Sequence, residues 1–368
     1  METNTAAADT EEANTEAADT EAPAARLRRA AWQLGAAMLG SAPGGNQAGS
    51  PAGLLVALAM LRAGAGSRTA AELDAVLGFP QQHRNEAVAA LLAVWAAYDG
   101  DPACAAAAGP PQRPVLHLAN GIFADSGVCL GAGFLDALAT YFGCRVRQVG
   151  FGTPAAAAVL DAWVREHTGG RIAQAPLEPA SGTTLSLMNV LTFAAAWADP
   201  FSPADDGEPF TLADGTKVPV PMMFGLRTAT YAAGPGWRAL ELPYAEGFLM
   251  RLVLPGQGPP VFDAAQLAGI GDSLDAGPAA LVAVGLPKWE HRCFLDLMPV
   301  LAGMGLAGTA GPAPDFEAIH EDARVTAAAQ AGAISVAEAG TVAAAVTEFG
   351  MVTGAPPAPE VELVFDRP

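Results

Sequence analysis

The residues with the most distinctive types and spacing lie near the C-terminus, where a strand-like run at 333–336 is followed by Glu338 and Gly340. If the chain is extended here, alternate side chains fall on one face. The small residues that follow the glycine are Thr341, Val342, Ala343, Ala344, Ala345 and Thr347. Side chains of this size can join a β-sheet as an added strand without a preformed pocket, although an alanine run is also compatible with a helix.

Conventional catalytic and metal-binding patterns are missing from the sequence. His291 and Cys293 stand two residues apart without a second ligand pair, and there is no HExxH or CxxC motif. Gly131-Ala132-Gly133 and Gly269-Ile270-Gly271 lack the third glycine of a dinucleotide loop, so we interpret both as turns. No nucleophile elbow or phosphate loop is present either. The sequence therefore predicts no enzyme active site, no cofactor and no metal.

Composition indicates a globular chain with a substantial core. Of 368 residues, 51% are apolar and 15% are charged. The formal net charge of −19, with 19 basic residues against 38 acidic ones, argues against nucleic acid, which needs clustered Lys and Arg. The apolar stretch at 52–61 ends at Arg62 and is too short to span a bilayer. The four cysteines have no disulfide-framework spacing, so we expect free thiols.

The N-terminal residues 1–24 form a segment of a different kind. Glutamates and aspartates are interspersed there with alanines and threonines, without the basic start and apolar centre of a secretory signal. This composition predicts a disordered acidic tail. From this segment alone we expect a cytoplasmic location.

The elements that must position the small-residue row are helices in the first half and mostly strands afterwards. Helical spacing predicts helices at 25–38, 51–63, 70–77, 85–98 and 154–167. Strand patterns occur at 115–123, 185–193, 239–242, 249–254, 280–286 and 333–336. The order indicates an α+β fold.

Long runs of this sequence resemble one family. The run 187–197, which contains Asn189 and Trp197, and the run 214–223 match the serpin signature in order and spacing. Further matching segments in the same order are 50–73, 118–123, 134–151, 163–172, 286–289, 301–306 and 315–316. The resemblance covers about residues 27–368, and we interpret the chain as a bacterial-type serpin.

The resemblance implies a fold and a mechanism. The fold would be α+β, with about eight to nine helices around three β-sheets and an exposed reactive loop near the C-terminus. Residues 25–368 would form a single serpin domain, with the reactive loop at 338–358. In this family a protease cuts the loop, which then inserts into the main sheet and traps the protease as a covalent acyl complex. The native fold must therefore be metastable.

The resemblance also assigns roles to residues. The hinge would comprise Glu338, Gly340, Thr341, Val342, Ala343, Ala344, Ala345 and Thr347. Counting fourteen residues from Gly340 gives Gly354 as the bait, with Ala355 on the leaving side and Thr353 as the alternative bait. A bait this small and apolar points to elastase-like or subtilisin-like proteases rather than trypsin-like ones.

Control of sheet opening is implied for Asn189, Gln330, Pro51 and Trp197, with Trp197 where the loop joins the sheet. Family members commonly carry serines at the positions of Gly53 and Val56, and a histidine at that of Gln330, in a polar cluster with Asn189. Gln330 can still hydrogen-bond Asn189, since an amide both donates and accepts. The chain ends at Pro368, where serpins normally continue into two further strands, so we expect those strands to be lacking.

Three classes of function remain open. The first is a serine-type endopeptidase inhibitor, acting as a monomer on a serine or cysteine protease and not on nucleic acid or membranes. The second is a non-inhibitory serpin that binds a ligand or acts like a chaperone, or an inactive truncated serpin that proteases simply cleave. The third is an enzyme. Family resemblance favours an extracellular location, whereas the N-terminal sequence favours the cytoplasm.

Overall fold

The computed structural model describes residues 23–41, 45–78, 84–107, 109–176, 182–203, 207–256, 262–311, 313–341 and 358–368. Within these ranges the chain forms eight α-helices and one 3-10 helix, η1. The helices are α2 (Pro23–Gly40), α3 (Pro51–Ala63), α4 (Ser67–Leu77), α5 (Arg84–Ala96), η1 (Pro102–Ala106), α6 (Ala132–Phe142), α7 (Pro154–His167), α8 (Ala264–Asp275) and α9 (Met298–Gly303).

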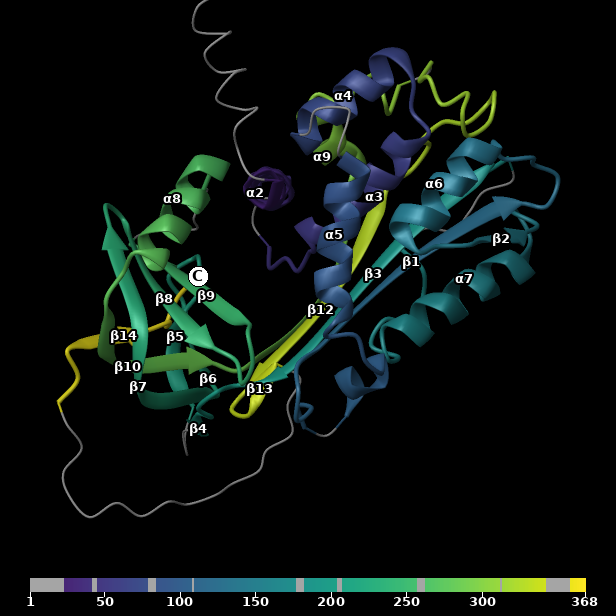
Figure 1. Cartoon of the computed structure of the whole chain (residues 1–368). Coiled ribbons are helices and arrows are strands. Elements are labelled where there is room, and N and C mark those ends of the chain that lie inside the picture. Colours follow the sequence, from purple (N-terminus) through teal and green to yellow (C-terminus); the bar gives the residue numbers. More distant parts are fainter. Residues whose placement is uncertain are drawn as a thin grey trace, which may run out of the picture.

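The strands form three sheets (Figure 1). The large sheet has the order β11-β12-β13-β3-β1-β2, the second has the order β14-β10-β7-β8-β9 with β4 paired to β7, and β5 and β6 form a ribbon. The strands of the large sheet are β1 (Val115–Asp125), β2 (Val146–Val149), β3 (Leu185–Ala196), β11 (Trp289–Asp296), β12 (Ala329–Ala337) and β13 (Gly340–Thr341). The others are β4 (Ser202–Pro203), β5 (Glu208–Thr211), β6 (Lys217–Val220), β7 (Met222–Gly234), β8 (Trp237–Pro243), β9 (Leu249–Pro255), β10 (Ala279–Pro287) and β14 (Val361–Val364).

Helix α3 forms the centre of the largest core, against one face of the large sheet. It is apolar on all sides, as expected for a helix buried between other elements. Pro51 occupies its first turn, and the Ser50 hydroxyl caps it by accepting a hydrogen bond from the Gly53 amide. Seven of its residues are buried: Gly53, Leu54, Leu55, Val56, Leu58, Ala59 and Met60.

Helix α7 covers the opposite face of the large sheet, across β1 and β3 (Figure 1). Ala156, Leu160, Trp163 and Val164 are buried in a cluster with residues of β1, and Met188 and Val190 of β3 pack against that cluster. The two faces of β3 therefore have different neighbours. Leu185 and Leu187, at alternate positions, pack against the α3 core instead.

The helices predicted at 51–63 and 154–167 are confirmed at those bounds. The interpretation of two glycine pairs as turns is wrong, because Gly269 and Gly271 lie inside α8 and Gly133 lies in the first turn of α6. In α8 a capping box, in which the Asp263 carboxylate accepts from the Gln266 amide and the Gln266 side chain accepts from the Asp263 amide, starts the helix strongly enough to accommodate both glycines.

At the N-terminus, α2 begins at Pro23, inside the segment predicted as a disordered tail, and residues 1–22 lie outside the described part. Of the described helices, none combines the length and the apolar composition needed to cross a bilayer. The expectation that two final strands are lacking stays a prediction.

Candidate loop-insertion site

The hinge begins inside the large sheet. After β12 the chain turns at Glu338 and returns as β13, which pairs antiparallel with both neighbours. Thr341 lies opposite Val336 of β12 and Ala195 of β3. Gly340 permits this contact, since a Cβ there would lie 2.2 Å from the Ala195 carbonyl oxygen, a backbone atom that cannot move aside. Gly340 and Thr341 of the predicted reactive loop are thus already part of a strand.

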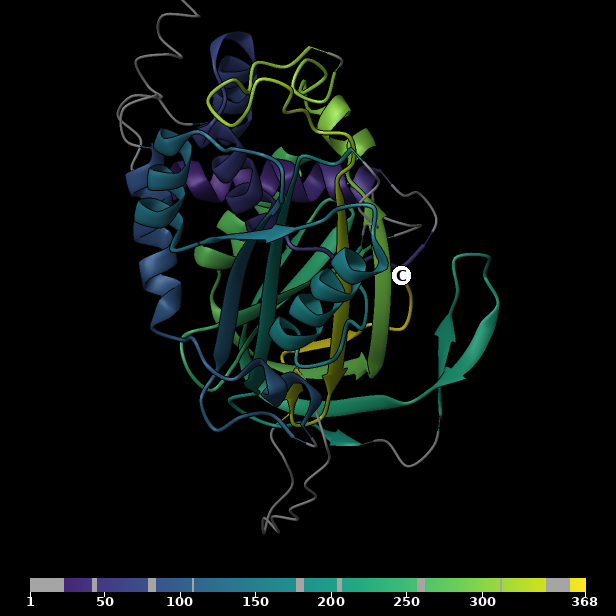
Figure 2. The same ribbon diagram turned by 90° about the vertical axis from the view of Figure 1, so that its right-hand side faces the viewer.

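Beyond Thr341 the sheet is open. Within the described part of the chain, no strand lies between residues 185–194 of β3 and residues 329–335 of β12, a space that we call the strand gap (Figure 2). Among the described strands, β3 pairs along that length with β1 alone, and β12 pairs with β11 alone. Two cavities, of about 1010 and 400 Å³, are lined by both strands. The facing backbone groups can accept one further strand.

Hydrogen bonds from the turn after β3 hold the hinge at the mouth of the strand gap. The Trp197 amide donates to the Ala339 carbonyl (3.0 Å), and the Phe201 amide donates to the Glu338 carbonyl (2.8 Å). The indole Nε1 of Trp197 donates to the Ala337 carbonyl (2.9 Å). Trp197 is only 2% exposed. Trp197 thus lies where the loop joins the sheet. Its role in controlling sheet opening stays a prediction.

Two further side chains secure the hinge. The Tyr244 hydroxyl hydrogen-bonds the Thr341 hydroxyl, and its ring stacks on Trp197 at a centroid distance of 4.4 Å. Burial raises the pKa of Tyr244 to about 12, so the phenol stays protonated at any physiological pH. Lys288 Nζ lies 2.8 Å from the Glu338 carboxylate, which is largely buried. The hinge is therefore held by hydrogen bonds, stacking and charge together.

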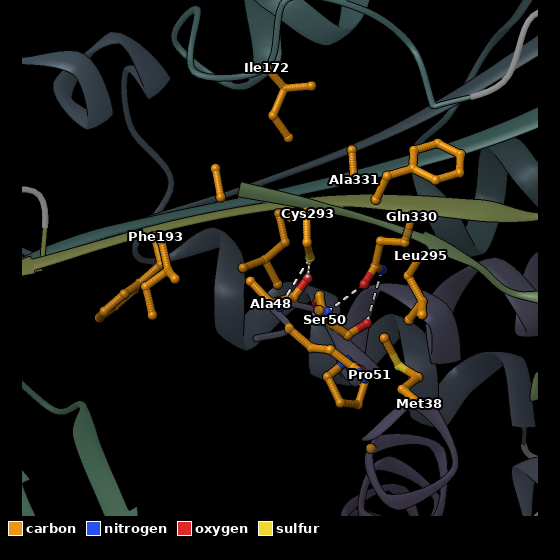
Figure 3. A pocket seen from close by; sticks show the side chains of 18 of the residues that line it. Met38, Ala48, Ser50, Pro51, Ile172, Phe193, Cys293, Leu295, Gln330 and Ala331 are labelled. Atoms are coloured by element: carbon orange, nitrogen blue, oxygen red, sulfur yellow. Dashed lines mark hydrogen bonds between the residues drawn. The ribbon is translucent and has the colours of Figure 1, made fainter. Parts of the chain in front are cut away.

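The polar residues beneath the strand gap are arranged differently from the prediction (Figure 3). The expected hydrogen bond between Gln330 and Asn189 is not formed in the structure. Gln330 instead accepts from the Ser50 amide and donates to the Ser50 carbonyl (3.2 Å), while Asn189 donates to Asn120 Oδ1 (2.7 Å). The reason is the strand gap, because β3 and β12 are too far apart for the two side chains to meet. Pro51 follows Ser50 at the start of α3.

Gly53 allows Asn189 to lie directly on α3. A Cβ at Gly53 would stand 2.3 Å from Asn189 Oδ1, so any larger residue must displace that amide. A helical glycine is normally improved by alanine, by about 0.5–1 kcal/mol. Here we expect Gly53→Ala to destabilise instead, by about 1–3 kcal/mol, because of overpacking.

Urea unfolding of Gly53→Ala measures this effect. Gly133→Ala is the matched control, since Gly133 is also helical and a Cβ there meets no atom within 4 Å. The control should be neutral or stabilising. If both substitutions stabilise the protein equally, the Asn189 contact is not tight.

The remaining predicted site residues belong to the segment after Thr341. Val342, Ala343, Ala344, Ala345 and Thr347 of the hinge lie outside the described residues, as do the bait and its neighbours: Thr353, Gly354 and Ala355.

Sequence reasoning missed Tyr244, Lys288, Ser50 and Asn120 as contacts of this site. Lys288 stands in the matching segment 286–289, but nothing in its spacing indicates Glu338 as a partner. Among the described residues no group of His, Cys, Asp and Glu side chains is suited to a metal ion.

A family profile for serpins, described as serine protease inhibitors, matches residues 25–368. Serpin-Z1B of Triticum aestivum is 30% identical over 351 residues, which span 88% of this chain and 84% of the relative. An uncharacterized serpin-like protein of Thermococcus kodakarensis is 30% identical over 83% of this chain and 71% of its own length. These relatives are from a plant and an archaeon, so they do not support the bacterial-type interpretation.

Solved structures share the fold. A thyroxine-binding globulin in complex with thyroxine superposes with a TM-score of 0.76 at 22% identity and covers 93% of this chain and 92% of its own. A thermophilic serpin, tengpin, in the native state has a TM-score of 0.77 at 19% identity, covering 93% and 88%. The cleaved Serpin 42Da reaches 0.76 at 26% identity, covering 87% and 88%. The protein belongs to the serpin family, whose members are in general protease inhibitors.

Proposed function

We propose that this protein inhibits serine-type endopeptidases by offering residues 342–357 as bait and inserting them, once cut, into the strand gap. The single observation that carries the proposal is the position of β13. Gly340 and Thr341 already pair with β3 and β12 at the mouth of the gap, and the facing edges beyond them are free of other described strands. A chain continuing from Thr341 in the same register meets both edges.

The register predicts which loop residues face the core. Thr341 is paired with Ala195 of β3 and with Val336 of β12, and the strands run antiparallel. Six residues further along the loop, Thr347 would therefore lie opposite Asn189 of β3 and Gln330 of β12. Side chains at odd positions, including Ala343 and Ala345, then share the face of Thr341, which is buried and directed to Tyr244. From 341 to 347 the odd positions carry only threonine and alanine, whereas the valines stand at the even positions 342 and 346. The composition of the loop therefore suits insertion.

Insertion releases enough free energy to drive the reaction. Filling ten positions of β3 adds on the order of ten ladder hydrogen bonds, at about 0.5–1.5 kcal/mol net each, or roughly 5–15 kcal/mol. This is comparable with the whole stability of a typical domain. The uninserted state is thus metastable, and cleavage of the loop removes the constraint that holds it there.

Inhibition depends on a competition between two steps. The protease serine attacks the Gly354 carbonyl and forms an ester, while Ala355 leaves with a protonated amine. If the loop inserts before water hydrolyses the ester, the protease is carried along the sheet and its active site is distorted. If hydrolysis comes first, the protein is only a substrate.

The bait indicates the target. Gly354, or Thr353 if the register differs by one, is small and uncharged, and Met351 and Val352 before it are apolar. Trypsin-like pockets carry an acidic group for Arg or Lys, so elastase-like or subtilisin-like serine proteases are better partners. A cysteine protease that accepts small residues is a further target, since it also forms an acyl intermediate.

The test is to mix the protein with an elastase-like and a subtilisin-like protease and to run denaturing gels. We expect a band at the summed mass, and mass spectrometry of the released peptide should give Ala355 as its first residue. The catalytic-serine variant of the protease is the control and should form no such band. Cleavage at this site without an adduct would refute the inhibitor proposal.

A second candidate, ligand binding without inhibition, is favoured by the cavity of about 1010 Å³ at the strand gap. One protein of similar fold, thyroxine-binding globulin, was solved in complex with thyroxine. Under this alternative the loop is cleaved without trapping the protease, and a small apolar ligand raises the melting temperature in proportion to the logarithm of its concentration above Kd.

A further inference from the structure

A chain of three titratable side chains lies outside the hinge. The Nδ1 atom of His117 on β1 lies 2.7 Å from the Asp99 carboxylate, and its Nε2 atom lies 2.9 Å from Nδ1 of His167. His167 is the last residue of α7, where it also packs on Trp163 with ring centroids 4.6 Å apart. The His117 side chain is 14% exposed. The hydrogen bond between the two imidazoles joins the end of α7 to the sheet beneath it.

The segment that follows His167 lies over the strand gap. Thr168, Arg171 and Ile172 line the larger cavity. Ile172 lies on the side of the sheet opposite Pro51 (Figure 3). The Arg171 guanidinium donates to the Ala105 carbonyl (3.1 Å) and lies 3.5 Å from Glu290 of β11, beyond the gap. An inserting strand must therefore pass beneath this segment, whose position depends on where α7 ends.

The number of protons on the two imidazole rings determines whether the hydrogen bond between His117 and His167 can form. Because Asp99 accepts from Nδ1 of His117, the neutral pair keeps its bond with His167 donating to Nε2 of His117. One added proton preserves the bond, since one ring remains an acceptor. A second proton makes both facing nitrogens donors, which removes the bond and sets two positive rings against each other.

The surroundings oppose that second proton at neutral pH. Burial and the neighbouring His117 lower the pKa of His167 below 6.5, and Arg147 on β2 acts in the same direction. Glu166 on α7 and Asp99 on the loop before β1 act in the opposite direction. From β3, the Thr192 hydroxyl donates a hydrogen bond to the His167 carbonyl (2.8 Å). Because the pKa of His167 is lower in the folded state than in the unfolded state, the stabilisation that the neutral His117–His167 pair provides is complete above pH 6.5. It is lost as the pH falls below that value.

We propose that the His117–His167 hydrogen bond is a pH-sensitive catch, which holds the end of α7 and the following segment over the strand gap and which mild acid releases, so that strand insertion is faster in acid. This inference rests on the proposed function, because it concerns the rate of insertion. Loss of one hydrogen bond corresponds to a factor of about three to ten. Since two protons are needed, the rate should rise more steeply than in simple proportion to proton concentration.

The experiment follows incorporation of a synthetic peptide with the sequence of residues 342–354 into the full chain, by native electrophoresis at pH 7.5 and 5.5. The wild-type rate should rise about threefold to tenfold on acidification. In His167→Gln, where an amide can still bond His117 but does not titrate, we expect no rise. His320→Gln is the matched control, because His320 lies outside the cluster, and it should behave as wild type. A His167→Gln variant that keeps the wild-type rise overturns the proposal.

A second measurement separates this inference from the proposed function. Hydrogen exchange of the last amides of α7 and of residues 168–171, corrected for intrinsic rates, reports release of the helix end without any insertion. Faster corrected exchange at pH 5.5 in wild type but not in His167→Gln supports the catch, even if no peptide is incorporated at either pH and the inhibitor proposal fails. Unchanged exchange in wild type overturns the catch.

Discussion

Under the proposed mechanism, replacing Thr347 with arginine should convert an inhibitor into a plain substrate of the protease. If the inserted loop continued the register of β13, residue 347 would come to lie between Asn189 and Gln330, on the face directed to α3. Its side chain would there approach Ser50 and Pro51, the N-terminus of that helix. An arginine at this point loses hydration and meets the positive end of the helix dipole.

The expected effect is large. Burying a charge without a partner costs several kcal/mol, and about 1.4 kcal/mol already slows a step tenfold. We therefore expect insertion of Thr347→Arg to be slower by about two orders of magnitude. Hydrolysis of the ester then precedes insertion. The stoichiometry of inhibition, titrated as moles of protein consumed per mole of protease inactivated, should rise more than about tenfold, and the covalent band should be replaced by cleaved protein.

Glu348→Arg is the matched control for this experiment. It introduces the same side chain one residue further on, where the strand presents its opposite face and the natural residue is already charged. We expect its stoichiometry of inhibition to stay within about twofold of wild type, because the new charge does not meet the α3 core. If both variants fail equally, or if Thr347→Arg still traps the protease, the register or the insertion itself is wrong.

Trp197→Ala should have the largest effect on the native state itself. The indole is buried among Tyr244, Phe201 and the hinge, and its Nε1 atom donates to the Ala337 carbonyl. Truncating a buried tryptophan costs about 3–5 kcal/mol. We expect a melting temperature lower by roughly 4–7 °C. In addition, the amides of Gly340 and Thr341 should lose protection, because the turn that holds the hinge is no longer anchored.

Two further variants separate the loss of stability from the loss of hinge protection. Trp163→Ala removes an equally buried indole, 3% exposed, from the α7 cluster. It should lower the melting temperature similarly but leave exchange at Gly340 and Thr341 unchanged. Trp197→Phe keeps the ring and removes only the Nε1 donor, at a cost of about 1 kcal/mol. Hinge protection that survives in Trp197→Ala would show that Tyr244 and Lys288 hold the hinge without Trp197.

Local periodicity was sufficient to predict much of the framework. Helix α3 follows from the apolar run after Ser50-Pro51, and strand β3 follows from the pattern at 185–193. In both cases burial of an element produces a regular pattern of apolar residues in the sequence. The small residues after Gly340 predict an inserting strand for the same reason, since β-strand side chains alternate between faces; beyond Thr341 this stays a prediction, because residues 342–357 lie outside the described part of the chain. The prediction of a turn at Gly269 and Gly271 was wrong, because the capping box at the start of α8 outweighs the low helix propensity of the two glycines.

Contacts between residues distant in sequence were decided by the tertiary structure. Gln330 bonds Ser50 instead of Asn189 because the strand gap separates β3 from β12, and no local pattern records that separation. Tyr244 reaches Thr341 and His117 reaches His167 because sheet register and helix packing bring them together. A side chain's burial is reflected in its own type, whereas its partner depends on the relative placement of elements, which only long-range packing determines.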